Sequence, residues 1–198
     1  DVTAAARRLL EAQHILLLTH RRPDGDTVGS AAGLCRALRG IGKQAFVLPN
    51  PEVTPLFANY LEGLTCGENY TPDTVVCVDI AARTMFPLNA QQYLDKVDLT
   101  IDHHPSQEFY AKHTLLDASC SACGEIIYDV LMEMGVEMTK ELAWRLYIAI
   151  STDTGCFRYS NTKDHTFATA AACAKAGARV YERNQELFEN NTLGRLRM

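Results

Sequence analysis

Residues 15–30 read Ile-Leu-Leu-Leu-Thr-His-Arg-Arg-Pro-Asp-Gly-Asp-Thr-Val-Gly-Ser. The apolar residues that open this stretch predict a buried strand, and the strand is expected to end at Thr19. One histidine, His20, and two carboxylates, Asp24 and Asp26, follow within seven residues. Polar side chains packed this densely beside a core strand indicate a binding site.

Strands and helices alternate along the rest of the chain. Strands are expected at 15–19, 44–48, 74–78, 98–101 and 113–117, and helices at 2–12, 27–38, 56–61, 122–135, 139–152, 166–176 and 180–189. Gly25 is expected to let the chain turn tightly before the second helix. This alternation predicts an α/β fold with a doubly wound, mostly parallel sheet of about five strands and flanking helices.

Length and charge limit the class of protein. The 198 residues suit one substantial domain, and the net charge of -5 argues against a basic face built for long duplex nucleic acid. No apolar run reaches the roughly 20 residues that a membrane helix needs, so no membrane partner is expected.

The chain has seven scattered cysteines, and we expect no signal peptide, which together favour a reducing, cytoplasmic location over a disulfide framework. Cys120 and Cys123 form the only C-x-x-C pair. We interpret this pair as small residues packed at the start of a helix, with a redox or zinc role as the alternative.

Acidic and imidazole side chains also follow two later strands and one helix. They are Asp79, then Asp102, His103 and His104, and finally Asp153. Because ligands bind at the carboxyl ends of parallel strands, these residues are expected to converge with the first cluster. Carboxylates brought so close together would repel one another unless divalent cations were bound. An oxygen-rich set with imidazole and no thiolate favours Mn²⁺, Mg²⁺ or Fe²⁺, and its size suits two ions about 3.5–4 Å apart.

Four motifs carry a family resemblance. They are His20-x-x-Pro23-Asp24-x-Asp26-x-x-Gly29-Ser30, Asp79 after its strand, Asp102-His103-His104, and Thr152-Asp153-Thr154-Gly155-x-Phe157-x-Tyr159-Ser160-Asn161-Thr162. Together they resemble the motifs of the DHH phosphoesterases, over residues 2 to about 190. The last motif and the small-residue helix after it are most similar to the oligoribonuclease (nanoRNase) group, which also dephosphorylates 3'-phosphoadenosine 5'-phosphate.

The resemblance implies a role for each residue. One ion would be held by His20, Asp24 and Asp79, and the other by Asp26, Asp79, His103 and Asp153. Two Mn²⁺ ions are expected, with Mg²⁺, Co²⁺ or Fe²⁺ as alternatives. Asp102 would orient a histidine, and His104 would face the scissile phosphate and could protonate the leaving oxygen. Apart from the resemblance, Arg158 has two interpretations: contact with a substrate phosphate, or a surface arginine near the site.

The implied reaction is hydrolysis by a metal-bridging hydroxide attacking in line. Short oligoribonucleotides or linear dinucleotides would give mononucleotides, and 3'-phosphoadenosine 5'-phosphate would give AMP. The alternatives are an inorganic polyphosphatase or pyrophosphatase, a RecJ-type single-strand exonuclease and a non-catalytic nucleotide sensor. All four motifs are complete, which favours an enzyme over the sensor.

Residues 1–187 are expected to form the catalytic domain. By the resemblance, residues 188–198 would begin a linker to a C-terminal substrate-binding domain, because no glycine- and histidine-rich motif of that domain occurs here. The expected partner is short RNA or a small nucleotide, and a homodimer is compatible with the sequence.

Three side chains outside the motifs complete the sequence analysis. His165 is expected to cap a helix, with substrate contact as the alternative. Trp144 and Tyr147 lie at helical spacing and are expected to pack in the core rather than to stack on a base.

Overall fold

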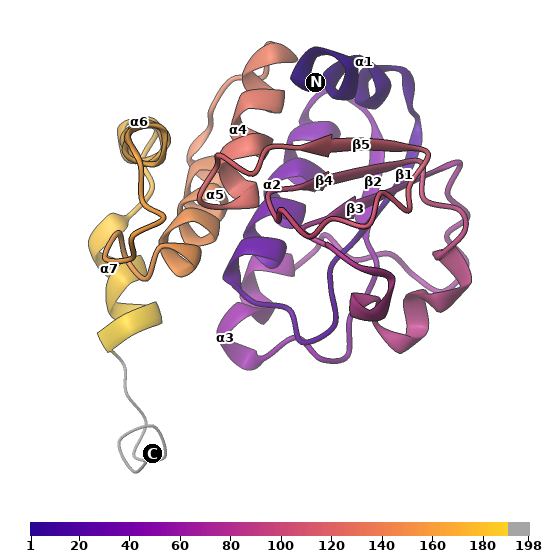
Figure 1. The fold of residues 1–198 in the computed structure, drawn as a ribbon, viewed down its shortest axis with the longest axis horizontal. Coiled ribbons are helices and arrows are strands. Elements are labelled where there is room, and N and C mark those ends of the chain that lie inside the picture. The colour runs from indigo at the N-terminus through magenta and orange to yellow at the C-terminus, as the bar shows by residue number, and fades with distance from the viewer. Residues whose placement is uncertain (190–198) are drawn as a thin grey trace.

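The fold was obtained as a computed structural model, which describes residues 1–189. Its centre is a five-stranded sheet in the order β2-β1-β3-β4-β5, and every pair of neighbouring strands is parallel (Figure 1). The strands are β1 (His14–Leu18), β2 (Gln44–Val47), β3 (Thr74–Val78), β4 (Leu99–Asp102) and β5 (His113–Leu116). The helices are α1 (Val2–Glu11), α2 (Gly25–Gly40), α3 (Pro55–Ala58), α4 (Cys123–Glu133), α5 (Lys140–Asp153), α6 (Asp164–Lys175) and α7 (Val180–Asn184). The predicted α/β class and parallel sheet are confirmed.

The two faces of the sheet are covered differently. Ile15 and Leu17 point into the larger core, which the sheet shares with α1, α2, α4 and α5. Leu16 and Leu18 point into a smaller core on the opposite face. That face is covered by loops and by two 3₁₀ turns, Arg83–Met85 and Leu88–Tyr93, which the sequence analysis did not predict.

Helix α2 begins at Gly25, two residues before the predicted start, because the Asp24 side chain caps it. One carboxylate oxygen of Asp24 accepts from the Asp26 N–H at 3.0 Å and the Thr27 N–H at 3.2 Å. The expectation that Gly25 serves a tight turn is wrong. It is the first residue of the helix, and a Cβ there would lie 2.4 Å from the Thr152 side chain, so the glycine allows α2 to meet the end of α5.

The last helices pack outside the sheet layers. In Figure 1, α6 and α7 lie beside α5, on the side away from the strands. The single helix predicted at 180–189 is α7 followed by a π-helical turn, Gln185–Glu189. Residues 190–198, most of the segment expected to begin a linker, lie outside the described residues. Within the described part of the chain, no helix is both long and apolar enough to cross a membrane.

Candidate functional site

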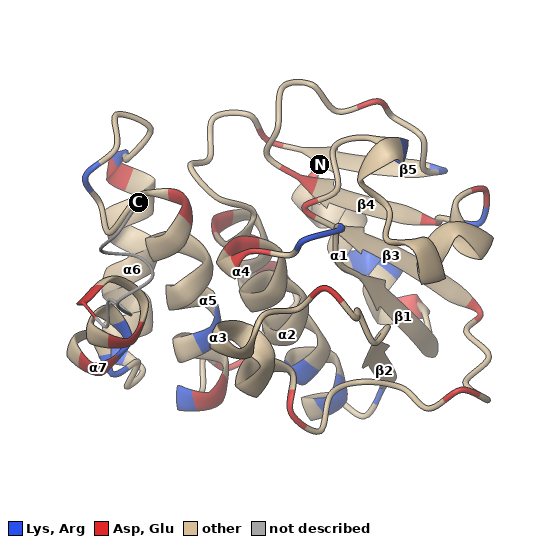
Figure 2. Cartoon of the chain, turned by 90° about the horizontal axis from the view of Figure 1, so that it is seen from below, with Lys and Arg blue, Asp and Glu red and all other residues tan. Residues whose placement is uncertain are grey.

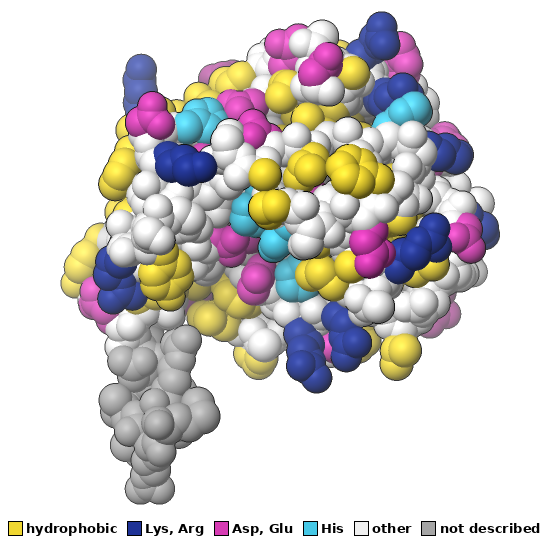
Figure 3. Space-filling view, viewed as in Figure 1, with side chains coloured by type: hydrophobic (Ala, Val, Ile, Leu, Met, Phe, Trp, Pro, Cys, Tyr) yellow, Lys and Arg dark blue, Asp and Glu magenta, His cyan; other side chains and the backbone are white. Residues whose placement is uncertain are grey.

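The carboxyl ends of three adjacent strands, together with the end of α5, form one acidic and imidazole-rich site. The predicted residues that meet there are His20, Asp24, Asp26, Asp79, Asp102, His103, His104 and Asp153. Figure 3 shows histidine and acidic side chains gathered near the middle of the visible face, where they are open to solvent. The predicted convergence of the separate motifs is thus present in the structure.

The first group of donor atoms lies after β1. His20 Nε2 is 3.6 Å from Asp24 Oδ1 and 3.7 Å from Asp79 Oδ2. The other ring nitrogen, Nδ1, donates to the Arg21 carbonyl at 2.7 Å, so Nε2 is directed at the carboxylates. The ligand atoms of these three side chains all lie within 4.8 Å of one another, which is compact enough to hold one metal ion.

The second group joins α2, α5 and the end of β4. His103 Nε2 is 3.7 Å from Asp26 Oδ2 and 3.3 Å from Asp153 Oδ2. Asp26 is fully buried, and three donors hold it in place: the Ser30 hydroxyl at 2.9 Å and the Cys123 and Gly124 N–H groups at 2.6 and 3.0 Å. The first turn of α4 therefore fixes this carboxylate, an arrangement that favours a negative charge.

Asp79 lies between the two groups. Its Oδ2 faces His20, while its Oδ1 is 3.6 Å from His103 Nε2 and 3.4 Å from His104 Nδ1. Asp79 also has a left-handed backbone, with φ of 62°, directly after the last residue of β3. Few residues other than glycine adopt that conformation, and it is concentrated at functional sites.

Asp102 is buried and organises the histidine pair. Its Oδ1 accepts from the His104 ring Nδ1 at 2.8 Å and from the backbone N–H groups of His103 and His104. Its Oδ2 accepts from the Gln107 side chain at 2.5 Å. The histidine that Asp102 orients is therefore His104, whose side chain is 37% exposed and so accessible from solvent.

Burial and mutual repulsion make the ionised carboxylates of the site energetically unfavourable without a counter-ion. Burial and the nearby carboxylates of Asp153 and Asp24 raise the pKa of Asp26 well above its usual range. Burial and Asp26 raise the pKa of Asp79 in the same way. Burial alone would lower the pKa of His103, but the hydrogen bond to Asp153 and the charges of Asp153 and Asp102 together outweigh this effect, and the pKa is raised.

Two atoms at the centre of the site have no hydrogen-bond partner although they are buried. They are Asp79 Oδ1 and His103 Nε2. Buried polar atoms are almost always satisfied, so an unpartnered carboxylate oxygen facing an unpartnered imidazole nitrogen fits a binding site for a cation. The donor set, carboxylate oxygens with imidazole nitrogens, suits hard or borderline divalent metals.

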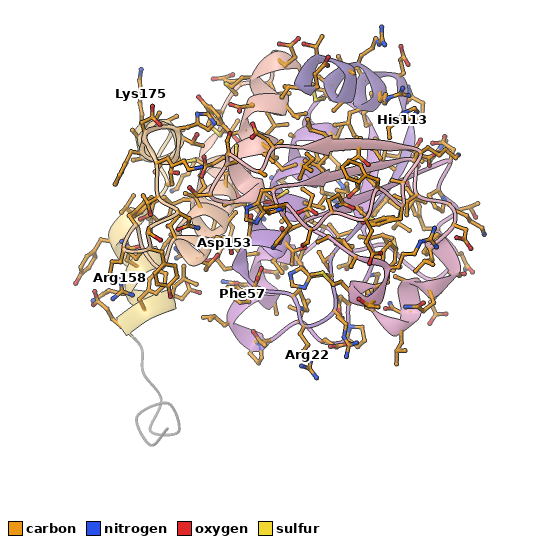
Figure 4. The ribbon with its side chains drawn as sticks, in the orientation of Figure 1. Arg22, Phe57, His113, Asp153, Arg158 and Lys175 are labelled. Atoms are coloured by element: carbon orange, nitrogen blue, oxygen red, sulfur yellow. The ribbon has the colours of Figure 1, made fainter. Side chains whose placement is uncertain are left out.

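Arg158 lies apart from this group. Its exposed guanidinium donates Nε–H to the Gly155 carbonyl at 2.6 Å, and Figure 4 places it beside α7, away from Asp153. It lines a cavity of about 630 Å³ together with Leu56, Phe57, Thr152, Cys156, Tyr159, Asn184, Leu187, Phe188 and Glu189. Thr152 precedes Asp153 in the chain, so the cavity adjoins the site.

The sequence did not predict the residues that support the site through hydrogen bonds to its side chains and backbone. Gln107 supports Asp102, Asn50 donates to the His20 carbonyl at 2.9 Å, and Asn161 donates to the Asp153 carbonyl at 3.1 Å. Asn161 belongs to the fourth motif, which was its only sequence signal. The partners of Gln107 and Asn50 depend on the folded arrangement of loops.

Two other expectations have clear outcomes. His165 does not cap α6: Lys163 occupies the N-cap position, its N–H donates to the Thr166 hydroxyl at 3.1 Å, and His165 Nε2 lies 3.1 Å from Asp129 Oδ2. Tyr147 is buried, and Trp144 stacks on Tyr60 with ring centroids 4.6 Å apart. The prediction of a core position is confirmed for Tyr147, whereas Trp144 is partly buried and packs against the core.

Positive charge is not gathered around the site. Figure 2 shows the Lys and Arg positions of the described residues distributed over many elements. A groove that tracks a long nucleic-acid backbone would need these residues concentrated on one face.

Comparison with known proteins relates the chain to one protein family. A model described as "DHH family, N-terminal domain" matches residues 14–150. The "Bifunctional oligoribonuclease and PAP phosphatase NrnA" of Thermus thermophilus is 31% identical over 87% of this chain and 53% of its own length. The protein of the same name from Bacillus subtilis is 30% identical over 88% of this chain and 57% of its own length. This chain spans about half the length of the curated relatives it matches.

The fold also has solved counterparts. An exopolyphosphatase-related protein from Bacteroides fragilis superposes with a TM-score of 0.85 at 20% identity, over 99% of this chain and 62% of that one. A putative family II inorganic pyrophosphatase from Methanococcus jannaschii superposes with a TM-score of 0.64, also at 20% identity, over 87% of this chain and 59% of that one. At this identity the likeness concerns the fold.

Proposed function

This chain belongs to the DHH family, and we propose from that membership that it carries the catalytic site of a phosphoesterase. The proposed reactions are hydrolysis of short oligoribonucleotides or linear dinucleotides to mononucleotides, and of 3'-phosphoadenosine 5'-phosphate to AMP. The observation that carries this proposal is Asp79, whose two carboxylate oxygens face histidines of two separate donor groups. The names of the curated relatives support the substrate class.

Two divalent cations would be held by the two groups, with Mn²⁺ as the proposed metal. The first group is His20, Asp24 and Asp79, and the second is Asp26, Asp79, His103 and Asp153. When bound, such a pair supplies a nucleophile near neutral pH by lowering the pKa of water and neutralises charge on the phosphoryl oxygens.

His104 would protonate the leaving group. It is more exposed than its neighbours, and its Nδ1 is engaged by Asp102, so Nε2 remains free to carry a proton towards substrate. Asp102 fixes the orientation of the His104 ring, and Gln107 in turn holds Asp102. These residues would deliver one proton to the departing oxygen.

The neighbouring cavity would receive the nucleotide beyond the scissile bond. Phe57 and Tyr159 offer flat apolar surface for a base, and Arg158 can turn its guanidinium towards a phosphate. The size of this cavity suits one or a few nucleotides, and the scattered basic residues disfavour a long strand. Free thiols at all seven cysteines are compatible with the proposed cytoplasmic location.

A substrate panel tests the proposal. Because this chain spans only part of its relatives, the assay compares it with a protein of the relatives' length, and a weaker reaction from the shorter chain would support the proposed linker and second domain. With Mn²⁺ present, we expect release of mononucleotide from a 5'-labelled RNA of a few residues and of AMP from 3'-phosphoadenosine 5'-phosphate. Inorganic polyphosphate or pyrophosphate as the preferred substrate would refute the nucleotide assignment while keeping the metal site.

A further inference from the structure

A second cluster of metal-binding side chains lies outside the site described above. Cys120, Glu125 and His165 each offer a donor atom, and these atoms all lie within 4.8 Å of one another. Cys120 comes from the turn before α4, Glu125 from the first turn of α4, and His165 from the first turn of α6. Segments about 40 residues apart in sequence thus place a thiol, a carboxylate and an imidazole together.

Glu125 is the residue that needs an explanation. It is fully buried, and its Oε1 accepts from the Ser121 N–H at 3.1 Å and the Thr166 hydroxyl at 2.9 Å. Its other oxygen, Oε2, is buried without a hydrogen-bond partner. A buried, unsatisfied carboxylate oxygen beside a thiol and an imidazole indicates a ligand between them.

We propose that Cys120, Glu125 and His165 form a cation site that prefers Zn²⁺ and is separate from the oxygen-rich centre. A thiolate with an imidazole and a carboxylate selects zinc, whereas the centre around Asp79 has no thiolate among its donors. Three protein ligands leave the fourth tetrahedral position to water. Asp129, whose Oδ2 is 3.1 Å from His165 Nε2, holds the imidazole as carboxylates commonly do beside zinc.

This assignment also separates Cys120 from its C-x-x-C neighbour. The Cys123 thiol is fully buried and donates to the Ile101 carbonyl, so it faces the sheet and not the cluster. A metal ion binds the thiolate form of cysteine, so the Cys120 thiol must lose its proton on binding. Binding of the ion displaces this proton to solvent, and the Sγ–H bond is replaced by a sulfur–metal bond.

The position of Cys120 links the two sites. Its carbonyl oxygen lies 3.4 Å from His103 Nδ1, the ring nitrogen that faces away from Asp79. A cation held by the Cys120 side chain would therefore fix the segment that contacts His103. The zinc site would act as a structural support for that histidine, without contacting substrate.

Cobalt spectroscopy tests the proposal, because a thiolate bound to Co²⁺ gives a near-ultraviolet charge-transfer band that oxygen and nitrogen ligands do not give. Co²⁺ is titrated into metal-free protein in the presence of excess Mn²⁺, which occupies the oxygen-rich centre. We expect the band to appear with one equivalent of Co²⁺ and to disappear when one equivalent of Zn²⁺ is added.

Three variants identify the residues that produce the band. Cys120→Ser is expected to remove the band, and His165→Ala, at a half-exposed position that does not threaten folding, to weaken Co²⁺ binding about tenfold or more. Cys66→Ser, a partly exposed thiol far from the cluster in the chain, is the matched control and is expected to keep the band. Absence of the band in the unmodified protein, its persistence in Cys120→Ser, unchanged Co²⁺ affinity in His165→Ala, or loss of the band in Cys66→Ser would each overturn the proposal.

Discussion

The two ends of the parallel sheet carry the same kinds of side chain, but these differ in burial and in whether each carboxylate has a partner. At the amino ends of the strands, His14 pairs with Asp73 at 3.0 Å and Lys112 with Asp98 at 2.7 Å. Each carboxylate there has its own partner, and the His14–Asp73 pair is about half exposed. At the carboxyl ends, several buried carboxylates share few histidines, and Asp79 leaves one oxygen without any partner.

The difference shows what marks a functional site in this molecule. Histidine and aspartate at a strand end are not sufficient, because both ends of the sheet have them. The distinguishing feature is buried charge that the protein does not itself compensate, which raises the pKa of Asp26 and Asp79. The predictions below change one end and use the other as the reference.

The largest effect is expected from Asp79. Asp79→Ala should lower kcat/KM for a short RNA by about 10³-fold or more, the scale on which loss of an essential catalytic group acts. Asp79→Asn keeps the size of the side chain and tolerates the left-handed backbone, so it separates lost charge from altered folding. The reference variant, Asp73→Ala, should leave kcat/KM unchanged. Undiminished turnover in Asp79→Ala would refute the bridging position of this residue.

A smaller loss of activity is expected from Gln107, which contacts Asp102 and lies further from the reacting atoms. Gln107→Leu removes the donor to Asp102, and Asp102 then holds the His104 ring less firmly. We expect kcat/KM to fall about 10–100-fold, as for other supporting partners of catalytic groups, with most of the change in kcat. Gln91→Leu, which removes a donor to a backbone carbonyl away from the site, is the control. Equal kinetics in the two variants would remove Gln107 from the site.

The stability of the metal-free protein should depend on pH because the site at the carboxyl ends of the strands contains buried titratable side chains. The pKa values of Asp26 and Asp79 are raised on folding, so the folded state binds more protons and its stability falls as pH rises above about 3.9. The raised pKa values of His20 and His103 act in the same direction above about pH 6.5. Asp24, whose pKa is lowered, stabilises the folded state above about pH 3.9, and this contribution is lost as the pH falls below that value.

The free energy of unfolding in chelator, measured by urea denaturation, should therefore be higher near pH 6 than near pH 8. Added Mn²⁺ should reverse the trend, because the ligands must lose protons to bind a cation. A flat profile in chelator, or an identical profile with Mn²⁺, would contradict the uncompensated charge at this end of the sheet.

The smallest effect is expected at the amino end. Asp73→Ala removes an exposed ion pair and a hydrogen bond to the His14 N–H, and exposed pairs contribute about 0–1 kcal/mol. The free energy of unfolding should change by no more than that amount, and the change should diminish at high salt. A loss comparable to that of a core truncation would show that the two ends are less different than their geometry indicates.

The sequence was sufficient to predict the strands and helices that have a clear local pattern of apolar and polar residues. The strand at 74–78 is five residues of β-propensity bounded by polar residues, and β3 occupies those positions. The donor residues were predictable for the same reason, because each follows a recognisable apolar strand or ends a periodic helix. The 3₁₀ turns between 83 and 93 have no such periodicity and were missed.

What the sequence could not show depends on contacts between distant segments. The N–H groups of Cys123 and Gly124 hold Asp26 across about 97 positions, and Thr152 excludes a side chain at Gly25. Neither contact leaves a local pattern. The cluster of Cys120, Glu125 and His165 was hidden in the same way, because the order of residues along the chain offered Cys123 as the obvious neighbour of Cys120.

The left-handed backbone at Asp79 has a consequence for protein engineering. Glycine at this position would relax the backbone, and asparagine would remove the buried charge, so each substitution is expected to make the metal-free chain easier to fold. A library selected only for thermal tolerance in chelator would accumulate such replacements and become inactive while its melting temperature rises. Including Mn²⁺ during selection would reverse the advantage and keep aspartate at position 79.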